Sequence, residues 1–278
     1  AQRVSRADSA RAQVARATQV ERAVTGKPMP SFPVDTPRAI PRRQLSGSLA
    51  AHGTLTGNIH SFDMTGAATG DRLVAFGSSA SAIRANYTWT TAFTPQSRVS
   101  VQMSAVNVLA MGFALDTVSL TTAYTHPNGN ITLKILQDST RIYNATAQFT
   151  LDNDHDDLRL DQLRLQFDTT IYASTGPSTI HFDSAGTSID HFEVKSKSGS
   201  RVFLNGEIPV TGPADLQLSI TQFEASNITA LLQSDIDARG LFSIDAHMQG
   251  TRANPTFTGA FGIERFFYNG HRTPEVHG

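Results

Sequence analysis

The densest group of side chains able to do chemistry is the acidic run Asp152, Asp154, Asp156 and Asp157, in the stretch LDNDHDDL. Carboxylates at alternating positions match the first, third and fifth positions of a calcium-binding EF-hand loop. The sixth position, however, is Asp157 where that loop needs glycine, and the twelfth is Leu163 in place of a bidentate glutamate. Helices are not expected on either side, so the run predicts a polar β-turn and not a metal site.

Other signatures of catalysis or cofactor binding are absent from the sequence. Nine histidines are scattered along the chain, and no two have the helical spacing of metal ligands. The chain contains no nucleophile-elbow serine motif, no zinc-protease motif, no phosphate-binding loop and no dinucleotide-binding glycine motif. It also has no cysteine, which excludes disulfides and thiolate metal sites. We therefore expect no enzymatic activity, no cofactor and no bound metal.

A glycine-framed segment occurs twice. Glycines stand at 47, 57, 66 and 77, and again at 240, 250, 259 and 270, which is a constant offset of 193 residues. Apolar positions between the glycines also correspond, such as Leu49 with Phe242. Recurrence at a fixed offset indicates a structural repeat, and glycines at this spacing mark the turns and bulges of short antiparallel strands. We predict related β-meander units at 47–77 and 240–270.

The first 44 residues differ from the rest. Residues 1–26 have small apolar side chains at three- and four-residue spacing, which predicts a basic amphipathic helix that ends at Gly26. Residues 27–44 contain five prolines and predict an extended linker. Nine basic and three acidic side chains in residues 1–43 make this part positively charged, but no aromatic residue precedes Phe32 to stack on bases. Nucleic acid is therefore not expected as a partner.

Residues 45–278 have the pattern of β-strands almost throughout. Apolar and polar residues alternate, which is typical of antiparallel strands with one apolar face. About sixteen such strands are more than an open sheet holds without curling or splitting. The helix predicted at 1–26 cannot cover such a face. A second, short helix is predicted at 225–234, with Leu231 and Leu232 pointing inward. We predict an all-β fold with one long antiparallel sheet rolled into a trough with an apolar interior.

The apolar residues of the alternating strands are the candidate lining of this trough. An ordinary core, in which the same residues pack against each other, is the competing interpretation. The candidate lining residues are Leu163, Leu165, Phe167, Ile180, Phe182, Ile189, Phe192, Val194, Val202, Leu204, Leu216, Leu218, Ile220, Phe242, Ile244 and Met248.

Residues 45–278 resemble the TamB/AsmA-like envelope proteins. In that family a segment with recurring glycines and a final pair of leucines is followed by a second segment with a Gly-Thr pair, a proline and further glycines. Here the first segment corresponds to Gly176–Pro177, Gly186, Ile189, Phe192, Gly199, Leu204, Gly206, Gly212, Asp215–Leu216 and Leu231–Leu232. The second corresponds to Gly240, Gly250–Thr251, Pro255, Gly259 and Gly270. The unit at 47–77 fits this second segment but has Phe62 where the proline would stand.

This resemblance implies a β-taco, a long folded sheet with a hydrophobic groove for phospholipid acyl chains. It implies a periplasmic protein of a Gram-negative-type cell envelope that transports phospholipid and supports outer-membrane biogenesis and protein assembly or secretion. An outer-membrane β-barrel is the implied partner. The implied inner-membrane anchor is not in this sequence, which has no run of eighteen apolar residues, and we expect the chain to be part of a longer protein.

Two other interpretations stay open at this stage. The chain could be a structural or adhesive β-repeat scaffold with a self-packed core and no lipid ligand. It could also be an outer-membrane barrel, whose apolar residues face lipid and whose aromatic residues gather at strand ends. Phenylalanine and tyrosine fall mid-strand as often as at strand ends, as at Phe167, Phe182 and Phe203. Many predicted strands are also shorter than the nine to eleven residues needed to span a membrane, which disfavours the barrel.

Overall fold

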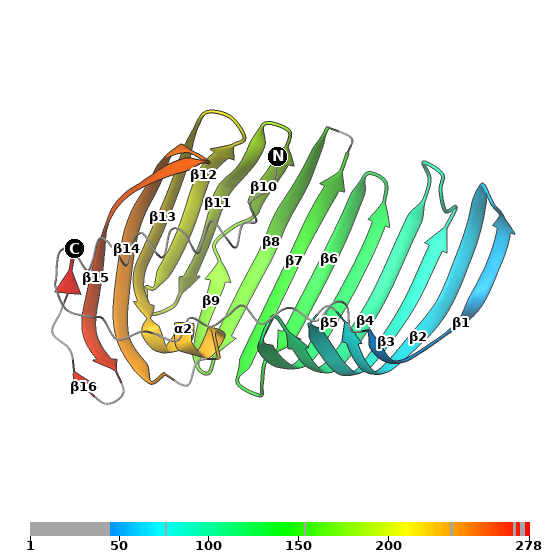
Figure 1. Cartoon of the computed structure of the whole chain (residues 1–278), viewed down its shortest axis with the longest axis horizontal. Helices are drawn as coiled ribbons and strands as arrows, with labels where there is room; N and C mark the ends of the chain where they lie inside the picture. Colours follow the sequence, from blue (N-terminus) through cyan, green and yellow to red (C-terminus); the bar gives the residue numbers. More distant parts are fainter. Residues whose placement is uncertain (1–44, 76, 153, 234–235, 269–270, 273–275) are drawn as a thin grey trace, which may run out of the picture. The chain divides into compact units, whose positions relative to one another are not determined.

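The computed structural model describes residues 45–75, 77–152, 154–233, 236–268, 271–272 and 276–278. The helix predicted at 1–26 and the linker predicted at 27–44 lie outside these described residues. In the described part the chain is almost entirely β-strand, which confirms the all-β prediction. Figure 1 shows the strands side by side in an order that follows the sequence.

Seventeen strands and one helix make up the described part. The first eight strands are β1 (Ser46–Asn58), β2 (Ser61–Ala75), β3 (Ser78–Thr90), β4 (Arg98–Ala110), β5 (Phe113–Thr125), β6 (Asn128–Leu136), β7 (Arg141–Leu151) and β8 (His155–Phe167). The remaining elements are β9 (Thr170–Ser174), β10 (Ser178–Asp183), β11 (Gly186–Ser196), β12 (Arg201–Pro209), β13 (Pro213–Glu224), α2 (Ala225–Leu231), β14 (Ala238–Thr251), β15 (Asn254–Tyr268), β16 (His271–Arg272) and β17 (Val276–His277).

The strands form one antiparallel sheet joined by hairpins. From β1 to β8, and from β11 to β15, each strand pairs with the next one in the sequence. Strands β9 and β10 share a single row between β8 and β11, and each pairs with one half of both neighbours. The row is interrupted at Thr175–Pro177, where Pro177 has no N–H to donate to a ladder.

The two glycine-framed segments occupy opposite ends of this sheet with the same register. β1 pairs with β2 from Asn58↔Ser61, and β14 pairs with β15 from Thr251↔Asn254, which are positions 193 residues apart. Both hairpins have a register shift at the corresponding glycine, Gly47 or Gly240, with φ of 111° and 124°. Because only glycine adopts such φ values easily, the repeated glycines preserve the bulge that bends each hairpin.

The helix α2 shows that the sheet is rolled. Just after α2, the side-chain amide of Gln233 accepts a hydrogen bond from the Ala114 N–H in β5 at 2.7 Å and donates one to the Ala114 carbonyl at 2.6 Å. In a flat sheet β5 and β13 would lie about 33 Å apart, at about 4.8 Å per row. A helix of seven residues is only about 10 Å long, so these contacts require a curled sheet. Figure 1 shows α2 across the strand ends near β9.

The orientation predicted for the helix is wrong. Leu231 and Leu232 were expected to point inward, but their side chains are 43% and 58% exposed. Ala225 and Asn227 are buried instead. The helix approaches the sheet through its first turn because β13 leads directly into it, and its last residues extend away toward β5.

Candidate functional site

One face of the sheet is apolar along its whole length. In antiparallel ladders, directly opposed residues lie on the same face. The registers Leu204↔Leu218 and Leu218↔Ala246 therefore join β12, β13 and β14 on one side. The predicted lining residues Ile189 and Phe192 are three residues apart, yet they share this face because β11 has a bulge between them, opposite Gly206 and Leu204. All sixteen predicted lining residues fall on this face by such registers.

The apolar face extends well beyond the predicted residues, toward β1. An unbroken row of opposed residues runs through Met103, Leu120, Leu133, Ala145 and Leu163, from β4 to β8. The alternation of Ile131, Leu133 and Ile135 was visible in the sequence, but these strands were not assigned to the lining. Their apolar residues are interrupted by alanine and threonine, which weakens the sequence signal without breaking the face.

Most of this face is incompletely buried. Among the sixteen predicted residues, Phe167 and Val194 are buried, Phe182 is 43% exposed, and the other thirteen are half-buried. In the described part of the chain, seven of the ten buried hydrophobic residues are alanines. A self-packed core would instead bury its leucines, isoleucines and phenylalanines completely. The face therefore has the composition of one layer of a hydrophobic core, but no complete second layer from the described part of the chain packs against it.

The end of the sheet near α2 is an exception. Tyr172 is completely buried and stacks on Phe223 with ring centroids 4.8 Å apart, and its ring also meets the edge of Phe167 at 6.0 Å. The buried side-chain amide of Asn227 in α2 donates a hydrogen bond of 2.9 Å to the Tyr172 hydroxyl. Aromatic pairs of this kind add to simple burial. Here α2 and the curled strand ends close the trough.

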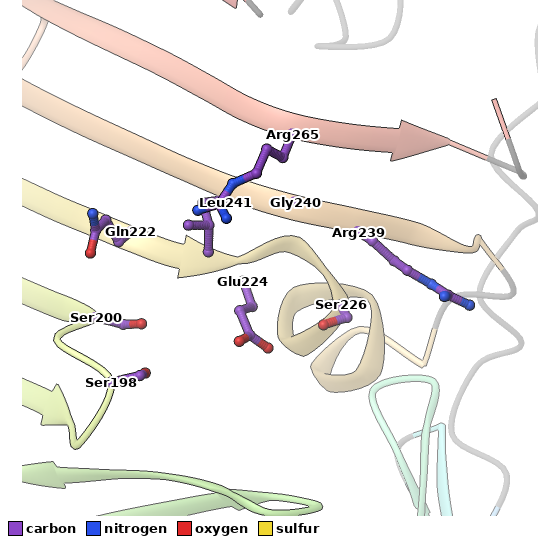
Figure 2. A pocket seen from close by; sticks show the side chains of 9 residues that line it. All are labelled: Ser198, Ser200, Gln222, Glu224, Ser226, Arg239, Gly240, Leu241 and Arg265. Carbon is purple, nitrogen blue, oxygen red and sulfur yellow. The ribbon is translucent and has the colours of Figure 1, made fainter. Parts of the chain in front are cut away.

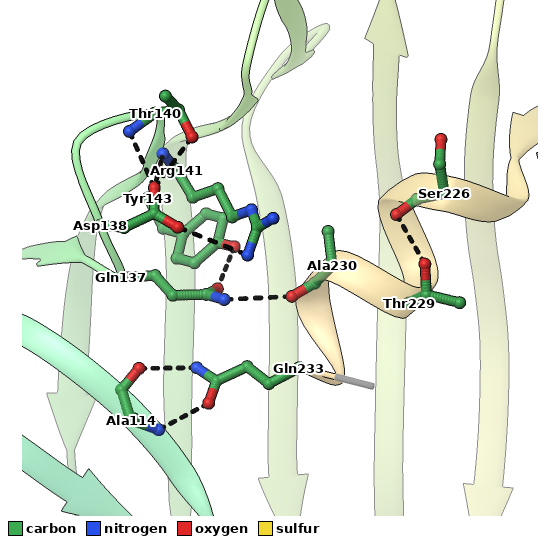
Figure 3. A network of polar contacts seen from close by, with 10 residues as sticks. All are labelled: Ala114, Gln137, Asp138, Thr140, Arg141, Tyr143, Ser226, Thr229, Ala230 and Gln233. Atoms are coloured by element: carbon green, nitrogen blue, oxygen red, sulfur yellow. Dashed lines mark hydrogen bonds and ion pairs between the residues drawn. The ribbon is translucent and has the colours of Figure 1, made fainter. Parts of the chain in front are cut away.

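A polar network borders this closed end, where β6 and β7 meet α2 (Figure 3). Gln137, which is buried, donates through Nε2 to the Ala230 carbonyl at 3.1 Å and accepts from the Tyr143 hydroxyl at 2.6 Å. Burial raises the pKa of Tyr143 to about 12. The Tyr143 hydroxyl therefore stays neutral and keeps its role as a donor. Loss of water contact tends to raise the pKa of Asp138, but hydrogen bonds from Thr140 and the Arg141 N–H outweigh this and lower it.

The largest cavity near the helix does not continue the apolar face. It has a volume of about 650 Å³ and is lined by Ser198, Ser200, Gln222, Glu224, Ser226, Arg239, Gly240, Leu241 and Arg265. Figure 2 shows the carboxylate of Glu224 between the hydroxyls of Ser198 and Ser226. Leu241 is the one large apolar side chain in this lining. A cavity of this polarity does not suit an acyl chain.

Asp152 and Asp154 of the acidic run lie at a turn, as predicted, whereas Asp156 and Asp157 belong to β8. Strand β7 ends at Leu151 and β8 begins at His155, so the run spans a hairpin. Asp157 forms an ion pair with His181 Nδ1 of β10, and His181 Nε2 lies 3.3 Å from Asp183. Among the described residues, no group of three or more His, Asp or Glu side chains is arranged to hold a metal ion. These side chains therefore link two neighbouring rows of the sheet.

No helix in the described part of the chain has the length and hydropathy needed to span a membrane. Comparison with protein-family models, with curated proteins and with solved structures found no match to this chain. The site is therefore defined by its geometry, an extended apolar face that is half-buried over most of its length and closed at one end by α2.

Proposed function

We propose that the apolar face is a groove that holds and conducts the acyl chains of phospholipids. The observation that carries this proposal is the incomplete burial of thirteen predicted lining residues on one continuous face. Burying a large apolar side chain fully is worth about 1.5–3 kcal/mol relative to leaving it exposed. An acyl chain lying on this face would supply the missing burial without requiring any specific polar contact.

The cellular role in this proposal rests on the resemblance to TamB/AsmA-like envelope proteins. We place the chain in the periplasm of a Gram-negative-type envelope, as part of a protein anchored in the inner membrane. There it would carry phospholipid toward the outer membrane and, with an outer-membrane β-barrel partner, support outer-membrane protein assembly or secretion. The rolled antiparallel sheet with an apolar interior is compatible with this role.

A structural or adhesive scaffold with no lipid ligand is the second candidate. It is favoured by the closed end, where Phe167, Tyr172 and Phe223 pack on each other as a core does. A scaffold of this kind would pack the whole face in the same way, or cover it with another protein.

Photo-crosslinking in cells separates these two functions. A benzophenone side chain would replace Phe182 on the apolar face or, as a control, Gln217, which lies exposed on the opposite face of β13. We expect phospholipid adducts from position 182 and none from position 217, detected by mass spectrometry. Absence of lipid adducts at both positions would favour the scaffold.

A charge placed in the groove tests transport. The double substitution Leu218→Asp with Phe242→Asp puts two carboxylates on neighbouring strands of the apolar face. Because both residues are half-buried, the sheet can keep these charges in contact with water. We expect phospholipid transfer between vesicles to be lost while the circular dichroism of the sheet is retained. Normal transfer by this variant would count against the groove.

A further inference from the structure

A polar cavity opens directly beside the apolar face at the closed end. It has a volume of about 470 Å³ and is lined by Ala114, Gln137, Asp138, Arg141, Ser226, Thr229, Ala230 and Gln233. These residues come from β5, from the β6–β7 turn and from the α2 region, which are far apart in the sequence. Figure 3 shows the cavity residues of the β6–β7 turn facing α2. The cavity therefore lies at the edge of the apolar face, beside the strand ends near α2.

Arg141 connects this cavity to the groove. Its register opposite Phe167 places it on the apolar face, in the same column of β7 as Tyr143, which lies opposite Leu165. A cation on an otherwise apolar strand face needs a partner or water. Arg141 is thus a charged residue at the edge of the surface on which we propose that acyl chains lie.

The guanidinium of Arg141 has an unused donor. Its Nη1 lies 3.4 Å from Asp138 Oδ2, which is a single and rather long contact and not a two-point one. The other carboxylate oxygen of Asp138 already accepts hydrogen bonds from the N–H groups of Thr140 and Arg141 and from the Thr140 hydroxyl. The Nε–H of Arg141 is buried and has no hydrogen-bond partner among the described residues. A buried donor left unpaired is unfavourable. Because Nε is buried, a ligand in the cavity would meet the Nη groups of Arg141, which make one long contact with Asp138.

The surroundings of this donor are held in place before any ligand arrives. Gln137 is fixed between the Tyr143 hydroxyl and the Ala230 carbonyl, and Gln233 is fixed by both backbone groups of Ala114. Each of these two side-chain amides therefore already uses one N–H and its carbonyl oxygen. The guanidinium of Arg141 is the positively charged group that the cavity offers to a ligand.

We infer that Arg141 binds the phosphate ester of an amphiphile whose acyl chains lie on the adjacent apolar face. Guanidinium groups recognise phosphate oxygens by charge-assisted hydrogen bonds. The Nη groups of Arg141 line the cavity beside the Asp138 carboxylate, and Arg141 lies opposite Phe167 on the face. The inference rests on the proposed function and adds to it a fixed position for the headgroup, at the rim beside α2.

The test compares two probes that share their acyl chains and differ in whether they carry a phosphate-containing headgroup. The 278-residue chain would be incubated with phosphatidylglycerol or with diacylglycerol of the same acyl chains, and binding would be measured by native mass spectrometry. Two variants would be compared, Arg141→Gln and, as a matched control, Arg164→Gln, whose arginine is exposed on the opposite face of β8. We expect the native chain and Arg164→Gln to prefer phosphatidylglycerol by about tenfold, from one charge-assisted hydrogen bond. The preference should fall to about twofold or less in Arg141→Gln.

The outcomes separate this inference from the proposed function. If neither probe binds the native chain, the proposal that the apolar face holds acyl chains is wrong. If both probes bind but Arg141→Gln keeps the same preference as Arg164→Gln, the groove stands and the headgroup site is overturned.

Inorganic phosphate alone is the third probe. Saturable binding of phosphate that depends on Arg141, without any preference between the two lipids, would assign the site to free phosphate and overturn the headgroup assignment. Circular dichroism of both variants verifies that the sheet is intact.

Discussion

The closed end and the open face of the trough use the same kinds of residue but bury them differently. Tyr172 at the closed end is completely buried, whereas Leu218, Ile244 and Met248 on the open face are only half-buried. Both groups lie on one continuous apolar face of a single sheet. The difference is that α2 and the curled ends of β8, β9 and β13 cover Tyr172, whereas Leu218, Ile244 and Met248 keep part of their surface exposed.

This comparison shows that burial here depends on topology more than on residue type. A strand can present an apolar face by alternation alone, but the second layer that completes a core must come from elsewhere. In the described part of the chain, α2, which interrupts the succession of strands between β13 and β14, contributes to that layer over Tyr172. We propose that acyl chains complete the burial over the half-buried strands.

Replacing Tyr172 should have the largest effect on stability. The change Tyr172→Ala removes a fully buried ring and leaves Asn227 without its acceptor, so we expect the free energy of unfolding to fall by about 4 kcal/mol. The same change at Tyr124, a half-buried ring on the same face of β5, is the matched control and should cost about 2 kcal/mol. Urea unfolding followed by circular dichroism measures both. Equal losses in the free energy of unfolding would mean that the closed end and the open face are not buried differently.

Glu193 should make a smaller, pH-dependent contribution near the closed end. Its carboxylate accepts a hydrogen bond from the Thr175 hydroxyl at 2.6 Å and pairs with Arg201 and Lys195. The bond from Thr175, helped by the two cations, lowers the pKa of Glu193 from 4.5 to about 2. We expect Glu193→Gln to lower the free energy of unfolding by about 2 kcal/mol at neutral pH.

The sign of the pH dependence follows from this lowered pKa. The contribution of Glu193 is fully present above pH 4.5, its ordinary pKa, and is lost as the pH falls from there to about 2. Native protein and Glu193→Gln should therefore converge in melting temperature as the pH is lowered through this range. A difference in melting temperature that stays constant from neutral to acidic pH would contradict the assigned ion pairs.

Leu218 should show a small effect if the face is open. Because its side chain is only half-buried, Leu218→Ala leaves no enclosed cavity, and we expect a loss of about 1 kcal/mol in lipid-free protein. A loss of about 3 kcal/mol or more is the cost of deleting a leucine from a packed core. A value of that size in urea unfolding would mean that the face is covered in solution.

The smallest expected effect concerns His181 on the polar side of the sheet. The hydrogen bond from its ring to Asp157, with a further contact to Asp183, raises the pKa of His181 above 6.5. The interaction of protonated His181 with Asp157, which joins β10 to β8, is therefore fully formed below pH 6.5. It is lost as the pH rises through the raised pKa of His181. Titration by NMR should give a midpoint above 6.5 in native protein and a lower one in Asp157→Asn. Identical midpoints in the two proteins would rule out this contact.

Alternation in the sequence was sufficient to predict the antiparallel sheet and its apolar side. Strand β7 is bounded by polar turns on both sides, and Pro177 interrupts the row that β9 and β10 share, so both features follow from local residues. These features depend on residues that are close together in the sequence.

The closed end could not be predicted because it depends on distant pairs. The contact between Gln233 and Ala114 joins residues 119 positions apart and exists only because the sheet curls. The helix was predicted, but its burial was assigned to Leu231 and Leu232, whose apolar character said nothing about which turn of α2 meets the sheet. Arg141 gave no signal either, because an arginine at the start of a strand is common on solvated faces.

The equivalent hairpins at the two ends of the sheet also set the capacity of the trough. Twelve inter-strand steps separate β1 from β14 when β9 and β10 count as one row, which is a contour of about 58 Å at about 4.8 Å per step. One leaflet of a bilayer has a hydrocarbon thickness of about 15 Å, half of the core. If the proposed groove follows this curled contour, it has room for several phospholipids in single file. Native mass spectra of a loaded chain should accordingly contain a series of occupancies and not one bound lipid.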